Sequence, residues 1–176
     1  MPENELIDVI DDNENIVATV KKSTAQKEHL LRWGTCILVY NAKGRLLIHK
    51  RAAQKKVEPN KWDFSVGGWL ISGEKQNAGA LRELEEEIGA KNVDLIFLGK
   101  IRINYKTSNN ISYVYKTVYN GIIKPQKEEI SECEWIKLDT LATLMHEKDF
   151  TTWCEYYCNY HFEQNFGNLT RNSDKI

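Results

Sequence analysis

A predicted helix in the middle of the chain constrains the fold more than any other feature. Its apolar residues Leu81, Leu84 and Ile88 recur at the i, i+3, i+7 spacing of one helix face. Gly89 stands where a left-handed glycine commonly ends a helix, and Asn77 is the predicted N-cap. The segment is therefore expected to be an amphipathic helix whose Leu81/Leu84/Ile88 stripe packs against a core.

The same helix carries four glutamates within five positions: Glu83, Glu85, Glu86 and Glu87. At about 100° per residue, Glu83, Glu86 and Glu87 fall within one sector opposite the apolar stripe, and Glu85 points elsewhere. Like charges at this spacing repel, so we expect a cation among them. Arg82 can neutralise one carboxylate, and the remaining oxygens suit a hard divalent cation such as Mg²⁺ or Mn²⁺. A solvated acidic helix face is the alternative interpretation.

These glutamates belong to a longer pattern with fixed spacing. Gly68 is followed after five residues by Glu74, after seven more by Arg82-Glu83-Leu84, and then by Glu86-Glu87 and Gly89-Ala90, each after one residue. The pattern resembles the Nudix box, G-x5-E-x7-R-E-U-x-E-E-x-G-U, where U is a bulky aliphatic residue, and departs from it only at the small Ala90. The strings WGTCILVYNAKGRLLIHKR, PNKWDFSVGG and EEISECEWIKL are also similar to segments that flank the box, so the resemblance covers residues 33–140.

Strands and helices intermix without regular βαβ alternation, which predicts the α+β class. Strands are expected at 6–10, 16–20, 35–40, 45–49, 62–71 with a break at Gly67-Gly68, 96–98, 101–105, 111–122 and 134–138, and further helices at 140–146 and 150–162. The resemblance implies the Nudix fold, a mixed β-sheet sandwiched between helices (α/β/α). We expect an N-terminal β-hairpin extension (1–30), a Nudix hydrolase domain (31–165) and a polar, frayed tail (166–176).

Composition limits the partners. Lysine plus arginine number 24 against 25 aspartates and glutamates, a net charge of −1, so neither nucleic acid nor an anionic membrane is an expected partner. No apolar run could span a membrane, the first thirty residues show no secretory pattern, and the four cysteines form no C-x-x-C pair. We therefore expect a cytoplasmic protein with reduced thiols. The strand edges of the N-terminal hairpin predict a homodimer.

The resemblance implies a hydrolase that cleaves a diphosphate linkage in a nucleoside diphosphate derivative, with Mg²⁺ or Mn²⁺ as cofactor. In that family pattern Glu86 and Glu87 bind the metal, the Gly68 carbonyl is a further ligand, and Glu83 is a ligand or the base that deprotonates the attacking water. Arg82 would hold these carboxylates by bidentate pairing.

The resemblance also implies that Glu74 pairs with Arg82 or orients the loop, and that a glutamate outside the box completes the site. Glu129 is the preferred candidate over Glu128, and a surface charge pair is the alternative. For the nucleotide-type substrate, the candidate binding residues are Lys50, Arg51, Trp62, Trp69 and Tyr105. The aromatic residues could equally belong to the core, and the two cations to a solvated strand end.

Two other functions compete with hydrolysis. The flanking strings are also similar to isopentenyl-diphosphate isomerase, which needs a cysteine and a histidine where this chain has Gly67 and Trp69. Without a thiol or imidazole there, proton transfer at an alkene carbon has no obvious agent. A Nudix-fold binding or regulatory module without catalysis is the second alternative, although such modules usually show substitutions among the box glutamates.

Overall fold

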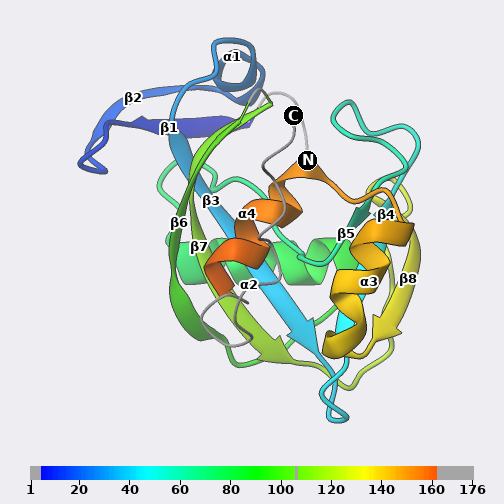
Figure 1. The fold of residues 1–176 in the computed structure, drawn as a ribbon. Coiled ribbons are helices and arrows are strands. Elements are labelled where there is room, and N and C mark those ends of the chain that lie inside the picture. The colour runs from blue at the N-terminus through cyan, green and yellow to red at the C-terminus, as the bar shows by residue number, and fades with distance from the viewer. Residues whose placement is uncertain (1–4, 106, 162–176) are drawn as a thin grey trace.

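The computed structural model describes residues 5–105 and 107–161, and the elements are labelled in Figure 1. In chain order they are β1 (Leu6–Ile10), β2 (Ile16–Lys21), α1 (Lys22–Lys27), β3 (Arg32–Tyr40), β4 (Leu46–Arg51), β5 (Trp62–Asp63), α2 (Gln76–Ile88), β6 (Ile96–Tyr105), β7 (Ser108–Val118), β8 (Ile130–Ile136), a 3-10 turn (Leu138–Thr140), α3 (Leu141–Glu147) and α4 (Thr152–His161). No helix in these ranges is long and apolar enough to cross a membrane.

The eight strands form one mixed sheet around β3. Strand β7 runs parallel to β3 along its whole length, and β6 lies antiparallel beside β7. On the other side, β4 pairs with β5 and β8 but meets β3 at a single pair, Tyr40 opposite Leu46. From that pair the two strands diverge, as Figure 1 shows, and the sheet opens between them.

Alternating side chains of β3 build two separate cores. Cys36 and Leu38 point into a cluster that includes Tyr157 of α4, whereas Ile37 and Val39 point into a cluster that includes Leu84 and Ile88 of α2. In Figure 1, α2 lies behind the sheet and α3 and α4 lie in front of it. The expected α+β class and the arrangement of helices on both faces of a mixed sheet are therefore confirmed.

Helix α2 ends as predicted but sits differently on the sheet. Gly89 adopts φ 70° and its N–H bonds to the Glu85 carbonyl, which closes the helix. The expected N-cap is wrong, because the helix begins at Gln76 and Asn77 lies inside it. The expected stripe is also wrong at Leu81, which is 40% exposed. The helix rests on Ala80, Leu84 and Ile88, whose i, i+4, i+8 spacing rotates Glu83 toward the sheet.

Several other boundaries differ from the expectations. The N-terminal hairpin is present as β1 and β2, but it is followed by α1, a six-residue helix without apolar periodicity that was not predicted. Residues 96–105 form one bulged strand in place of two, and only Trp62–Asp63 of the expected strand at 62–71 has strand geometry. Strand β8 begins at Ile130, before the expected start. The expected tail at 166–176 lies outside the described residues.

Candidate active site

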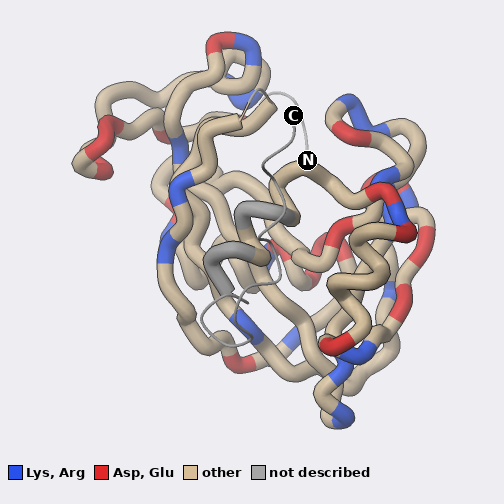
Figure 2. Tube along the Cα trace, viewed as in Figure 1, with Lys and Arg blue, Asp and Glu red and all other residues tan. Residues whose placement is uncertain are grey.

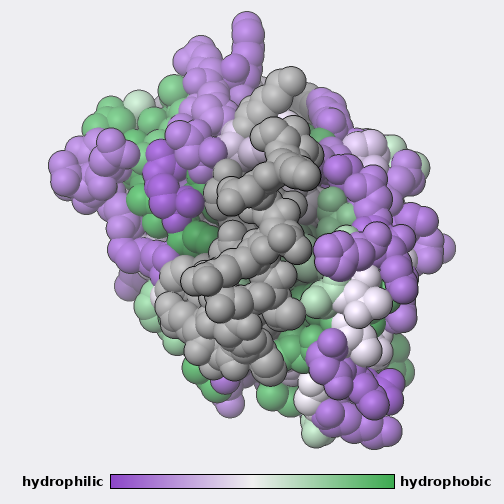
Figure 3. Space-filling view, in the orientation of Figure 1, coloured by the Kyte–Doolittle hydropathy of each residue, from purple (hydrophilic) through white to green (hydrophobic). Residues whose placement is uncertain are grey.

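A cavity of about 710 Å³ opens where β3 and β4 diverge. One set of lining residues is acidic and comes from α2 and from the segment before β8: Glu83, Glu86, Glu87, Glu128 and Glu129. Another set is basic and comes from α1 and from the loop between β4 and β5: Lys22, Lys27, Lys55 and Lys56. Figure 2 shows the basic segments of α1 and of that loop at the same end of the molecule, and Figure 3 shows hydrophilic surface over both.

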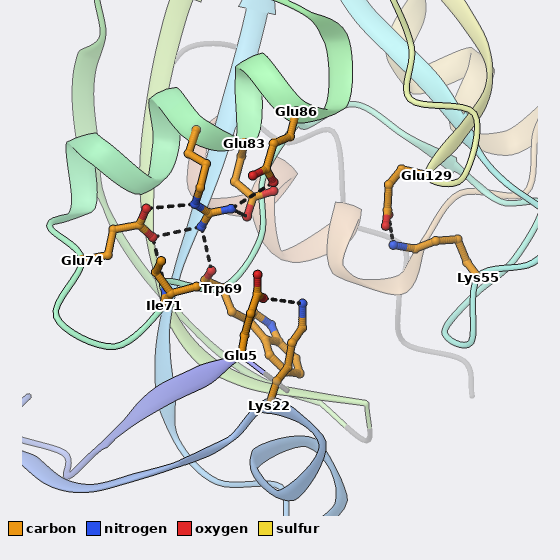
Figure 4. A network of polar contacts seen from close by, with 10 residues as sticks. Glu5, Lys22, Lys55, Trp69, Ile71, Glu74, Glu83, Glu86 and Glu129 are labelled. Atoms are coloured by element: carbon orange, nitrogen blue, oxygen red, sulfur yellow. Dashed lines mark hydrogen bonds and ion pairs between the residues drawn. The ribbon is translucent and has the colours of Figure 1, made fainter. Parts of the chain in front are cut away.

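Arg82 links the loop before α2 to the helix (Figure 4). Its Nε and Nη2 donate to the two carboxylate oxygens of Glu74, each at 2.9 Å. Its Nη1 donates to Glu83 at 2.8 Å and to Glu86 at 3.2 Å, and its Nη2 also donates to the carbonyl of Trp69 at 3.3 Å. These carboxylates raise the pKa of Arg82, so its charge is permanent. The expected contact between Arg82 and Glu74 is present.

Two glycines allow the loop and the helix to approach this closely. A Cβ on Gly68 would lie 2.6 Å from Oε1 of Glu83, and a Cβ on Gly79 would lie 2.2 Å from Cδ2 of Leu70. The Gly68 carbonyl, an expected metal ligand, accepts a hydrogen bond from the Thr35 N–H at 2.8 Å. Because Gly68 has no side chain, the loop can lie directly against the carboxylate of Glu83.

Glu83 is the most unusual charged group of the site. Its side chain is 1% exposed, and within the described residues Oε2 has no hydrogen-bond partner while Oε1 accepts from Arg82. Burial raises the pKa of Glu83 to about 7, against the opposing effect of Arg82. A buried carboxylate oxygen without a partner costs about 1–3 kcal/mol, so this position favours a cationic ligand.

Glu86 and Glu87 lie on either side of Glu83. Glu86 is 43% exposed and reaches Arg82 from the solvent side. Burial raises the pKa of Glu87, and the charges of Glu83 and Glu129 raise it further, which places these carboxylates close together. In the described ranges no three His, Cys, Asp or Glu side chains surround one point closely enough to hold an ion as they stand. Glu83 and Glu86 both accept a hydrogen bond from Nη1 of Arg82. The residues fit a hard cation by their oxygen donors and by the unpartnered Oε2 of Glu83.

Glu129 and Glu128 both line the cavity, but their contacts differ. Glu129 forms an ion pair with Lys55 from the loop between β4 and β5, and its carbonyl accepts from the N–H of Ala52. It is also the member of the pair whose charge acts on Glu87. This placement favours Glu129 over Glu128 as the additional glutamate of the site.

The candidate substrate residues divide into two groups. Arg51 and Trp69 line the cavity, whereas Lys50, Trp62 and Tyr105 lie outside its lining. Lys50 pairs with Glu132 at 3.0 Å, Trp62 packs under Lys148, and Tyr105 packs against the core cluster on the α4 side. These three side chains therefore make surface and core contacts, which was the alternative to a role in substrate binding.

Arg51 and Trp69, which line the cavity, also make contacts with other parts of the protein. Arg51 donates to the backbone carbonyls of Val57 and Glu58, which fixes the loop between β4 and β5. The ring of Trp69 is covered by the buried guanidinium of Arg32, whose Cζ lies 3.5 Å from the ring centroid. A base stacking on Trp69 would therefore have to use the opposite face.

Sequence reasoning missed several lining residues that come from outside the box. Lys22, Ser23, Gln26 and Lys27 come from α1. The buried His49 and Asp63 come from β4 and β5, and the Nδ1 atom of His49 has no hydrogen-bond partner in the part of the chain that the structure describes. The lysines of the K-R-A-x-x-K-K string could have indicated Lys55 and Lys56, but no local signal marks Lys22, because its position depends on the pairing of β1 with β3.

Comparisons with known proteins agree with this architecture. A family model described as the NUDIX domain matches residues 30–154. An uncharacterised Nudix hydrolase of Pseudomonas aeruginosa is 31% identical over 133 residues, which cover 76% of this chain and 79% of that protein. An isopentenyl-diphosphate Delta-isomerase of Streptomyces avermitilis is 27% identical over 156 residues, covering 84% of this chain and 79% of that protein.

A solved structure shares the fold. The protein DR0079 from Deinococcus radiodurans superposes with a TM-score of 0.77 at 21% identity, and the match covers 89% of this chain and 99% of that one. This structural match extends beyond residues 30–154, which the family model covers, to most of the chain.

Proposed function

The chain belongs to the Nudix family of hydrolases, and we propose that it cleaves a diphosphate linkage in a nucleoside diphosphate derivative with the help of Mg²⁺ or Mn²⁺. The observation that carries this proposal is the buried Glu83, whose Oε2 accepts no hydrogen bond from the described residues and lies among further carboxylates in a cavity with lysines on other walls. Such a cavity offers cation-binding oxygens and anion-binding ammonium groups together, which is what a metal-bound diphosphate requires.

We assign roles to the individual residues from the family pattern, and their contacts support the assignment. Glu83, Glu86 and Glu87 would hold the metal, with the Gly68 carbonyl as a further ligand, and the bound metal would supply charge neutralisation at the phosphoryl oxygens. Arg82 donates to both carboxylate oxygens of Glu74 and to Glu83, and it would thereby hold the Glu83 carboxylate in the cavity wall. Glu129 would take the proton of the attacking water, and Lys55, which now pairs with it, would then be released toward the substrate phosphates.

The geometry at Gly67 disfavours the isomerase alternative. Gly67 has φ 154°, and a Cβ there would lie 2.2 Å from the carbonyl oxygen of Thr35. No side chain fits at the position where the isomerase needs its cysteine, although an isomerase is among the relatives. The intact glutamate set likewise disfavours a binding module that has lost catalysis.

A panel of nucleoside diphosphate compounds, incubated at pH about 8 with Mg²⁺, with Mn²⁺ or with chelator, tests the proposal. We expect metal-dependent release of a phosphate-containing product that is lost in the Glu86→Gln/Glu87→Gln variant. The Lys43→Gln variant, altered in an exposed turn outside the cavity, is the control for folding and handling. Ligand-induced thermal stabilisation without turnover on any compound would favour the binding module instead.

We also propose a homodimer formed through the N-terminal hairpin, and a cytoplasmic location. Among the described strands β2 pairs only with β1, and Ile16 and Val17 on it are 55% and 61% exposed. The four cysteines are free thiols, as expected in a reducing compartment. Light scattering at micromolar concentration tests the dimer, and a monomeric mass would refute it.

A further inference from the structure

The N-terminal hairpin is fastened to the loop that carries the box residues. Asp8 of β1 accepts hydrogen bonds from the Ser72 hydroxyl at 2.7 Å and from the Gly73 N–H at 2.8 Å, and the Leu6 carbonyl accepts from the Ser72 N–H at 2.8 Å. Because Ser72 and Gly73 lie between Gly68 and Glu74, any residue at the end of the hairpin has a fixed position relative to the site.

A second connection fixes α1. The fully buried Arg32 donates from Nη1 to the carbonyls of Leu30 at 2.5 Å and of Ala25 at 3.3 Å, and its guanidinium stacks on the ring of Trp69. Ala25 is the buried residue of α1. The helix, its supporting arginine and the cavity tryptophan therefore form one packed unit.

This arrangement places Lys22 in the cavity wall. Its Nζ lies 5.6 Å from the ring centroid of Trp69 and 3.8 Å from a carboxylate oxygen of Glu5, and its side chain is 23% exposed. Glu83 and Glu129 both act electrostatically on it, so it lies within range of both acidic walls. Figure 4 shows Lys22 and Glu5 reaching toward the box from the side of the hairpin, with Glu83 and Glu86 of α2 above them.

We propose that Lys22 is a substrate-binding residue that contacts the phosphate oxygens of the diphosphate, so that the N-terminal extension completes the active site. This inference rests on the proposed function. A half-buried ammonium group that lines the same cavity as a carboxylate cluster is suited to an anionic ligand that brings its own cation. Lys22 lies before residue 30, where the match to the family model begins, so this contact would come from the N-terminal segment outside that match.

Binding of methylenediphosphonate, a diphosphate analogue that cannot be hydrolysed, tests the assignment in the presence of Mg²⁺ by calorimetry on the full chain. The Lys22→Gln variant should bind about tenfold or more weakly, as expected for loss of a charged hydrogen bond, and Lys22→Arg should retain most of the affinity. The matched control is Lys21→Gln, because Lys21 is the exposed neighbour and does not line the cavity. Thermal unfolding of each variant shows whether the fold is kept.

The outcomes separate this inference from the proposed function. If Lys22→Gln binds the analogue as the wild type does, or if the wild type does not bind it, the assignment of Lys22 is wrong. If the wild type hydrolyses a nucleoside diphosphate compound but Lys22→Gln leaves KM unchanged, only the inference fails. If binding depends on Lys22 but no compound is hydrolysed, the inference stands and the proposed hydrolysis fails.

Discussion

Substituting Arg82 by lysine keeps the charge of the residue but removes its planar guanidinium group. Arg82 donates two hydrogen bonds to Glu74 and one each to Glu83, Glu86 and the Trp69 carbonyl, five in these contacts. A lysine ammonium has only three donors, so at least two of these bonds are lost. Hydrogen bonds to charged groups contribute about 1.5–3 kcal/mol each. Because Arg82 is 21% exposed, the lower value applies, and the expected loss is about 3 kcal/mol.

The loss should be visible in thermal and chemical unfolding. For a domain of this size each kcal/mol lowers Tm by about 2–4 °C, so Arg82→Lys should lower Tm by about 6–12 °C. Arg45→Lys, in an exposed turn, is the matched control and should change Tm by less than about 1–2 °C. A change of less than about 0.5 kcal/mol in the free energy of unfolding of Arg82→Lys would refute the reasoning, because surface substitutions stay within that range.

Two further substitutions test the backbone of the loop and the titration of the site. Gly67→Ala should destabilise the fold by about 2–3 kcal/mol, because of backbone strain and close contact with Thr35. The control is Gly44→Ala, where φ is also positive but no atom of the described residues lies within 4 Å, and it should cost less. Equal losses of stability in urea unfolding would contradict this. Folded Glu83 holds its proton more tightly than the unfolded chain does, with a pKa of about 7 against 4.5, so in chelator its own contribution to the stability should fall as pH rises from 4.5 to 7. The Tm of the wild type minus that of Glu83→Gln should therefore fall across this pH range, and a difference that stays constant would show that burial does not raise the pKa of Glu83.

The sequence predicted those parts of the site that a single helix holds in relative position. Arg82, Glu83, Glu86 and Glu87 have fixed angular relations once the segment is helical, and Gly89 ends that helix as expected. The burial of Glu83 and the exposure of Leu81 could not be predicted in the same way. They depend on how the helix is rotated on the sheet, and that rotation is set by the packing of Ala80 and Ile88 against β3 residues far away in sequence.

The basic wall of the cavity was harder to predict for a related reason. Lys22 and Lys55 reach the site from segments that are far apart in the chain, and no local pattern marks Lys22 as a binding residue. Lys22 is positioned by strand pairing and by Asp8, and Lys55 by the carbonyls that Arg51 holds in the loop between β4 and β5. Contacts between distant segments follow from tertiary packing, which the periodicity of one segment does not contain.

The divergence of β3 from β4 also determines how firmly the loop before α2 is held. Where β4 leaves β3, residues 66–70 take its place: Ile37 and Val66 exchange two backbone hydrogen bonds, and the Leu70 N–H bonds to Trp33. The loop before α2 is thus tied to the central strand, and its amides at Val66 and Leu70 should exchange with deuterium as slowly as the sheet interior.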